Sequence, residues 1–353
     1  MKKNFSISYF LLNPQTLKYK YMKSRFLIYS ICILTCVSCK KQISEPPPNR
    51  ESLSSVIQPA PPPLLTNFWT HLNSPDQQGF GYKNCSFSVN GKGYVILGIF
   101  EQLWEYDPAT TVWTNKGATP HSVSTYAAVA FAIGSKGYFY TNDSRFWEYD
   151  PITNAWTGKQ DFPGENRTHA VGFAVNGKGY IGSGFKEIPT GTDNTLNDFW
   201  EYNPATNQWL QKANTPGYKR GGAIGFGTST RGYIGTGRSY FYFNGNYIGF
   251  YQNDWWEYNP VTNVWTQKTN YPGQSRIMIE GFVINDLLYM GIGSDVNGNL
   301  PNDFFRYNPS TDQWLIRNSP TELLSGQYTT GFSAGGHGYF VNGNLASFWR
   351  YTK

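Results

Sequence analysis

Residues 176–185 read NGKGYIGSGF and residues 197–212 read NDFWEYNPATNQWLQK, and this pattern occurs, with variations, six times along the chain. In each copy one tyrosine follows a GKGY-like turn, a phenylalanine lies seven residues before it, and a second tyrosine ends a W-E-Y-like triplet. The first tyrosines are Tyr94, Tyr138, Tyr180, Tyr233, Tyr289 and Tyr339; the second are Tyr106, Tyr149, Tyr202, Tyr258, Tyr307 and Tyr351; the phenylalanines are Phe87, Phe131, Phe173, Phe226, Phe282 and Phe332. This coincidence, in copies of different length, indicates one repeated structural unit.

The period of the repeat is that of a β-propeller blade. Successive second tyrosines are separated by 43, 53, 56, 49 and 44 residues, and four-stranded blades with glycine and aromatic markers have periods of about 40–50 residues. Each copy contains an apolar strand, a tight turn that is Asn-Gly in two copies, a second strand and the FWEY-like strand, and the first five copies add a tryptophan-bearing fourth strand. No copy has sustained helical spacing. We therefore predict an all-β, six-bladed propeller over residues 65–353.

The two ends of the chain complement each other. Residues 67–75, NFWTHLNSP, have the tryptophan and trailing proline of a fourth strand, but no first three strands precede them. The sixth copy ends at residues 348–351, FWRY, and lacks a fourth strand. We predict that the N-terminal strand completes the last blade, which leaves no open sheet edge.

The segment before the repeats has the features of a lipoprotein signal. Lys23 and Arg25 precede the apolar run FLIYSICILTCV and then Ser38 and Cys39, which is the order of a bacterial signal peptide. The ending VSC resembles a lipobox, so we predict residues 1–39 as the signal segment, with Met22 as a candidate start and Cys39 as the lipidated residue. The alternative is an ordinary cleaved signal. The proline-rich residues 40–64 are predicted to be an extended tether.

Charge and cysteine content exclude several classes of function. The whole chain has a formal net charge of +6, but residues 1–39 contain six of its 29 basic residues and no acid, which leaves 23 basic against 23 acidic residues. No basic patch for nucleic acid is therefore expected. Beyond residue 39 only Cys85 remains, so no internal disulfide can form.

At family level, the pattern Arg-x12-Tyr-x3-Gly followed by W-x-YNP-x-TNxW resembles the kelch motif, and it covers essentially all of residues 65–353. It differs in having G-x-G where the kelch motif has a double glycine. In its repeat pattern the chain is similar to galactose-oxidase-like propellers and to the six-bladed sialate mutarotase, N-acetylneuraminate epimerase. The resemblance specifies the fold and says little about function.

Three arginines occur at one register, thirteen residues before the first tyrosine of consecutive copies. They are Arg167, Arg220 and Arg276. In an up-and-down blade this position lies at the same end as the variable loop between the second and third strands, which is the expected functional end. We expect the three guanidinium groups at the channel mouth, where they bind an anionic ligand through bidentate hydrogen bonds. The alternative is a purely structural role within the repeat.

Two titratable residues depart from the repeat pattern and are candidate catalytic groups. Glu280 occupies an inner-strand register that is Cys, Val, Ile or Thr in the other copies, so burial could raise its pKa and make it a base. The alternative is a paired carboxylate, with Arg276 as its expected partner. His169 lies two residues after Arg167 and is a candidate proton carrier, or else a hydrogen-bonded rim histidine.

The longest insert, residues 239–254, reads SYFYFNGNYIGFYQND and predicts a projecting hairpin. Tyr240 and Tyr242 would present their rings to a sugar or, alternatively, pack the hairpin onto the propeller. No metal site, cofactor or complete catalytic set is predicted. Copper oxidation of the galactose-oxidase type needs a ligand set that this chain lacks.

We therefore expect a lipid-anchored, monomeric binding module in the cell envelope, at the outer membrane on its periplasmic or surface side. Its expected ligand is a glycan, an acidic sugar or a partner protein. The alternative function is that of a sugar-acid mutarotase, in which the three arginines hold a carboxylate while Glu280 or His169 moves protons.

Overall fold

The computed structural model describes residues 67–74, 85–97, 101–120, 128–186, 194–244, 246–321, 329–343 and 347–353, without the side chains of residues 242, 243 and 247. They belong to one compact unit, Pro62–Lys353. All regular elements in these ranges are β-strands, and none of the ranges contains a helix that would span a bilayer.

Six four-stranded antiparallel sheets form the blades in the described part of the chain. Blade one consists of β2 (Cys85–Val89), β3 (Lys92–Leu97), β4 (Gln102–Asp107) and β5 (Val112–Ala118). Blade two consists of β6 (Val129–Ile133), β7 (Lys136–Tyr140), β8 (Phe146–Asp150) and β9 (Ala155–Gly158). Blade three consists of β11 (Val171–Val175), β12 (Lys178–Gly182), β14 (Phe199–Asn203) and β15 (Gln208–Lys212).

The other three blades follow the same order, and the last one uses strands from both ends of the chain. Blade four consists of β16 (Ile224–Gly227), β17 (Gly232–Gly235), β20 (Trp255–Asn259) and β21 (Val264–Lys268). Blade five consists of β23 (Glu280–Ile284), β24 (Leu287–Gly291), β26 (Phe304–Asn308) and β27 (Gln313–Arg317). Blade six consists of β28 (Thr329–Ala334), β29 (His337–Asn342), β30 (Ser347–Thr352) and β1 (Phe68–Leu72).

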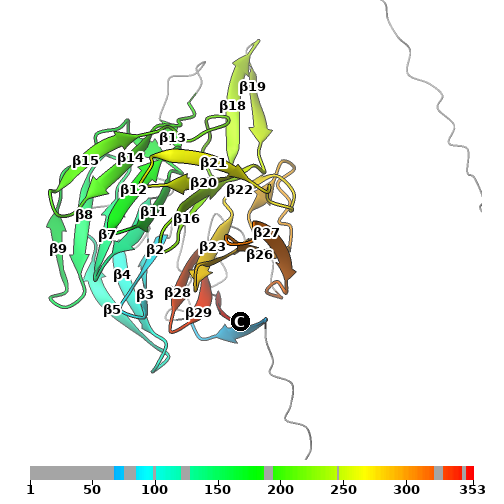
Figure 1. The fold of residues 1–353 in the computed structure, drawn as a ribbon. Coiled ribbons are helices and arrows are strands. Elements are labelled where there is room, and N and C mark those ends of the chain that lie inside the picture. Colours follow the sequence, from blue (N-terminus) through cyan, green and yellow to red (C-terminus); the bar gives the residue numbers. More distant parts are fainter. Residues whose placement is uncertain are drawn as a thin grey trace, which may run out of the picture. The chain divides into compact units, whose positions relative to one another are not determined.

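The first strands of the blades form a closed ring. Each contacts the first strand of the next blade, and β28 of blade six contacts β2 of blade one. Figure 1 shows the sheets arranged around this ring. The predicted six-bladed, all-β propeller is therefore confirmed.

The predicted closure by the N-terminal strand is also confirmed. β1 pairs with β30 and places Trp69 opposite Tyr351. The Trp69 indole donates to the Asn318 carbonyl of blade five at 2.7 Å, and the Tyr351 hydroxyl donates to the Asn67 side chain at 2.8 Å. Blades three, four and five repeat both contacts, so the N-terminal strand occupies an ordinary fourth-strand position.

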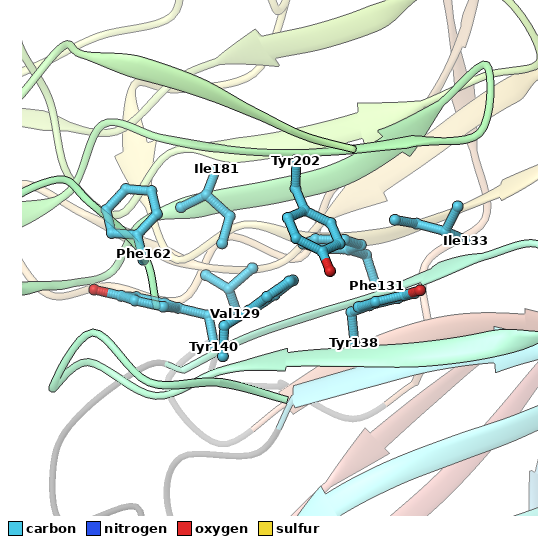
Figure 2. Close-up of a cluster of buried hydrophobic side chains, with 9 residues drawn as sticks. Val129, Phe131, Ile133, Tyr138, Tyr140, Phe162, Ile181 and Tyr202 are labelled. Carbon is cyan, nitrogen blue, oxygen red and sulfur yellow. The ribbon is translucent and has the colours of Figure 1, made fainter. Parts of the chain in front are cut away.

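Aromatic packing between neighbouring blades explains the constant spacing of the sequence markers. At five of the six interfaces, the phenylalanine of one blade lies against the glycine that precedes the first tyrosine of the next; blade five has Leu288 at this position. A Cβ atom on Gly179 would lie 2.4 Å from the Phe131 ring, and one on Gly93 would lie 2.0 Å from the Phe332 ring. Figure 2 shows one such interface, in which Phe131 and Tyr138 of blade two meet Tyr202 of blade three.

The loops that carry the inserts lie at one end of the blades. β10 (Arg167–Thr168), which precedes β11, pairs with β13 (Phe185–Lys186) of the loop between β12 and β14. β22 (Arg276–Ile277) pairs with β25 (Ser294–Asp295) in the same way. The ribbon of β18 (Arg238–Phe243) and β19 (Asn246–Tyr251) projects from this end in Figure 1. We call this end the insert face. It combines the links before the first strands with the loops between the second and third strands, as the sequence predicted.

Candidate binding site at the insert face and central channel

The three predicted arginines are buried in ion pairs. Arg167, Arg220 and Arg276 have relative exposures of 1%, 0% and 0%. Their Nη1 and Nη2 atoms donate to both carboxylate oxygens of Asp198, Asp254 and Asp303 over 2.5–2.7 Å. Nε and Nη1 also donate to backbone carbonyls in each blade.

These arginines are therefore not open to an anionic ligand, which corrects the expectation from the sequence. Each guanidinium is neutralised by its aspartate and its donors are used within the blade. The pair joins the link before the first strand to the residue before the third strand, so its role is to hold the insert loop. We call each pair an Arg–Asp clasp.

The clasps had a signal in the sequence that our reasoning missed. The aspartate lies four residues before the second tyrosine, and it occurs in the same three blades as the arginine. Where the arginine is absent, this position holds Gln102, Arg145 or Ser347. The arginine position itself is then Gly81, Thr125 or Gly326, which lie outside the described residues. Matched presence and absence across the repeats would have indicated the pairing.

A channel of about 440 Å³ lies inside the ring of first strands. Its wall has two different sides. Blades two, three and four contribute alanine, glycine, valine, isoleucine and phenylalanine, with His169 as their one polar side chain there. Blades five, six and one contribute the polar side chains Glu280, Thr329, Thr330, Ser333, Cys85, Ser86 and Ser88.

Glu280 begins the first strand of blade five and contacts blade six. Side chains at its register point to the next blade, as Val129 does where it fills the space beside Gly172. The Glu280 carboxyl accepts a hydrogen bond from the Gly331 backbone N–H. Arg276 binds Asp303 instead, so the expected Glu280–Arg276 pair is wrong, and no other ion pair to Glu280 occurs in the described ranges.

The surroundings of Glu280 keep it protonated near neutral pH. Desolvation by the protein around it raises the pKa of the carboxyl to about 8, and the Gly331 hydrogen bond only partly opposes this. Its side chain nevertheless lines the channel. Glu280 is thus a neutral acid at the channel wall. Its catalytic role stays a prediction.

His169 and Cys85 are the other titratable side chains of the channel wall. Desolvation, and secondarily the charge of Arg238, lower the pKa of His169 to about 4, so the imidazole is neutral at pH 7. Its ring centre lies 5.7 Å from that of Phe185. Desolvation, and secondarily Glu280, raise the pKa of the Cys85 thiol, which leaves it protonated and a poor nucleophile.

The ribbon places a cation among aromatic rings beside His169. The guanidinium carbon of Arg238 lies 4.2 Å from the ring centre of Tyr240, 5.4 Å from that of Tyr251 and 5.9 Å from that of Phe185. We call these four residues the Arg238 cluster. Tyr240 also contacts Phe185 at 5.5 Å, so it packs the ribbon onto the blade-three insert. The side chain of Tyr242 lies outside the described set.

Other predictions about sites concern metals and the N-terminal segment. Within the described ranges no group of three or more His, Cys, Asp or Glu side chains could hold a metal ion. Cys39, Met22, the signal segment 1–39 and the tether 40–64 lie outside the described residues, so these stay predictions.

Comparisons with known proteins support the fold and one local likeness. No known protein-family model matches the chain. The solved structure of YjhT superposes with a TM-score of 0.62 at 15% identity, covering 80% of this chain and 95% of that one. The chain is a kelch-like, six-bladed propeller. The propeller is also similar to N-acetylneuraminate epimerase of Pasteurella multocida (strain Pm70), with 41% identity over 51 residues, but this match spans only 14% of the chain and 13% of the curated relative's length.

Proposed function

We propose that this propeller is a binding module for a sugar that enters the central channel from the insert face. The two-sided channel wall carries the proposal. A pyranose ring has apolar C–H faces and a polar edge of hydroxyl groups, which fit an alanine- and glycine-rich wall opposite Glu280, Thr330 and Ser86. A volume of about 440 Å³ lies within the range of ordinary small-ligand pockets.

Hydrogen-bonding capacity on the polar wall favours a hydroxylated ligand. The Ser86 and Thr330 hydroxyls lie 2.8 Å apart, and Ser86 also donates to the Gly331 carbonyl, so lone pairs remain for a ligand. The protonated Glu280 adds a donor. An envelope protein partner is the competing ligand, and it would contact the outside of the insert face rather than the channel.

A binding panel tests the proposal. N-acetylneuraminic acid, its methyl ester and N-acetylglucosamine would be titrated calorimetrically against the full chain and two variants at the channel wall. Glu280→Gln keeps a donor and should retain binding, whereas Glu280→Val, the residue of blades two and three, should weaken it about tenfold or more because one hydrogen bond is lost. Equal affinity in both variants, or no sugar binding at all, would exclude the channel as the site.

The second candidate function is that of a sugar-acid mutarotase, and two observations support it. Glu280 has a pKa near working pH, as a general acid requires, and the local sequence likeness is to N-acetylneuraminate epimerase. In this role Glu280 would give a proton to the ring oxygen, while neutral His169 could accept the anomeric hydroxyl proton. NMR of the sialic acid anomers distinguishes the candidates, because a binding module leaves their interconversion rate unchanged.

The proposed location is the cell envelope, with the propeller tethered through a lipid on Cys39. Lys40 and Lys41 follow that residue and would favour anionic headgroups. Labelling with radioactive palmitate during expression should mark the wild type and not Cys39→Ser. Label in both, or in neither, would contradict lipidation at this cysteine.

A further inference from the structure

Arg238 differs from the clasp arginines in having no carboxylate partner in the described ranges. Its Nη1 atom donates to the Tyr251 hydroxyl at 3.0 Å. Its Nε atom is buried and makes no hydrogen bond. Each clasp arginine instead bonds both oxygens of an aspartate. Because the Nε atom is enclosed, an incoming anion would bind at the Nη groups of this half-buried guanidinium, whose charge no carboxylate in the described ranges neutralises.

The position of Arg238 connects this charge to the channel. Phe185 belongs to the Arg238 cluster, and its ring contacts both His169 and Tyr240. His169 lines the channel, and the Arg238 charge reaches far enough to lower the pKa of His169. The cluster therefore lies beside the channel wall at the insert face, in contact with His169 through Phe185.

Aromatic packing gives the guanidinium a defined position. Three rings lie within 6 Å of it, and such contacts stabilise a cation without neutralising it. Pairing of Arg238 with Tyr251 across the ribbon, together with the isolated bridge between Gly221 and Arg238, anchors the backbone on both sides. A charge held in place before the ligand arrives loses little entropy on binding.

We propose that Arg238 is an anion subsite that binds the carboxylate of a sugar acid whose ring enters the channel. This inference rests on the proposed sugar binding and selects, among its candidate ligands, the acidic sugars. It transfers the role expected of the three clasp arginines to a fourth arginine on the ribbon. Neutral Glu280 in the channel and cationic Arg238 at the rim then recognise different groups of one ligand.

The first experiment uses acetate, so it does not depend on the sugar. Arginine Nε–H signals of the full chain would be followed by NMR during an acetate titration at pH 7. The Arg238 signal should shift saturably, and that response should be absent in Arg238→Met, which keeps an unbranched side chain and removes the charge. Arg231→Met is the matched control, since it removes the same charge from a GKGY-type turn of blade four. No acetate response at Arg238 would overturn the inference.

The second experiment compares N-acetylneuraminic acid with its methyl ester. Wild type and Arg231→Met should bind the acid about tenfold tighter than the ester, as expected for one charge-assisted interaction. Arg238→Met should bind the two equally. Retained preference in Arg238→Met would overturn the inference while sugar binding stands. An acetate response at Arg238 with neither sugar bound would instead keep the anion subsite and overturn the sugar-binding function.

Discussion

Glu280 is the residue at which one blade departs most clearly from the pattern of the others. At this register the other blades carry small or apolar side chains that pack against the next blade. A carboxylate there can be tolerated only as the neutral acid, because it has no cation beside it. The same substitution therefore creates a donor in the channel and a dependence of stability on pH.

This dependence has a definite sign. The pKa of Glu280 is about 8 when folded, against about 4.5 as its ordinary value. Between these values the folded chain keeps the proton that the unfolded chain has lost, so stability falls as pH rises through this window and levels off above it. Glu280→Gln should lack this loss and be more stable than wild type by about 1–3 kcal/mol at pH 8. Urea unfolding of wild type and Glu280→Gln at pH 5, 6.5 and 8 measures this difference in stability. The same dependence of unfolding free energy on pH in both proteins would contradict the prediction.

A second residue-scale prediction concerns the turn before the fourth strand. Its last residue has positive φ in all six blades: Asn67 62°, Thr111 57°, Asn154 54°, Asn207 54°, Asn263 57° and Asp312 54°. Asparagine and aspartate tolerate this conformation and a β-branched residue does not. In blade three the Asn207 side chain also accepts from the Tyr202 hydroxyl.

Thr111→Asn should therefore stabilise the propeller by about 0.5–1 kcal/mol, because it relieves backbone strain and supplies the missing acceptor. Differential scanning calorimetry would show this as a rise in Tm of about 1–3 °C. Asn207→Thr is the reciprocal variant and should lower Tm. A fall in Tm for Thr111→Asn would show that its turn is held by other contacts.

At the scale of elements, the Arg–Asp clasps hold the insert loops to the blades. Arg220 spans from the link before β16 to Asp254 at the start of β20, and its Nη1 also donates to the Thr236 carbonyl. Because the guanidinium is fully buried, removing only its partner leaves an uncompensated charge.

We expect Asp254→Asn and Arg220→Met each to lower the free energy of unfolding by about 3 kcal/mol. The double variant should lose clearly less unfolding free energy than the two single variants added together, since no isolated charge remains. Arg231→Met, which breaks a more exposed pair with Glu257 at 3.7 Å, should cost less than about 1 kcal/mol. Additive effects of Arg220 and Asp254 in guanidinium unfolding would contradict the clasp.

At the scale of the whole molecule, one strand from the N-terminus closes the ring. Trp69 stacks on Phe340 with ring centres 5.1 Å apart and bonds the Asn318 carbonyl of the preceding blade. Without β1, the edge of β30 and the aromatic side chains beneath it would be exposed, which favours association of chains through that edge.

A chain of residues 62–353 should therefore keep the Tm of the full protein, whereas residues 76–353 should melt more than about 10 °C lower, because a whole strand and its aromatic core contacts are lost. Size-exclusion chromatography should also show association of the shorter chain. Trp69→Phe removes the indole hydrogen bond and keeps an aromatic ring, so its Tm should lie between those of the two truncated chains. Equal Tm for both truncated chains would contradict closure by β1.

The amino-acid sequence alone determined the number of blades, the closing strand and the end that carries the inserts. These features follow from local rules: two-residue turns with positive φ, strands of alternating burial, and phenylalanine packed on the glycine of the next repeat. These marks recur in most of the six copies at fixed spacing, so comparison of the chain with itself was sufficient.

The candidate site was decided by the tertiary structure. Whether an arginine is free depends on a partner 27–34 residues away across loops of different length, as Arg220 and Arg238 illustrate. The sequence named Glu280 as unusual, but only packing against Gly331 determined its partner and protonation. Charge and protonation depend on burial and on neighbours from other blades, and these are properties of the assembled ring rather than of any one repeat.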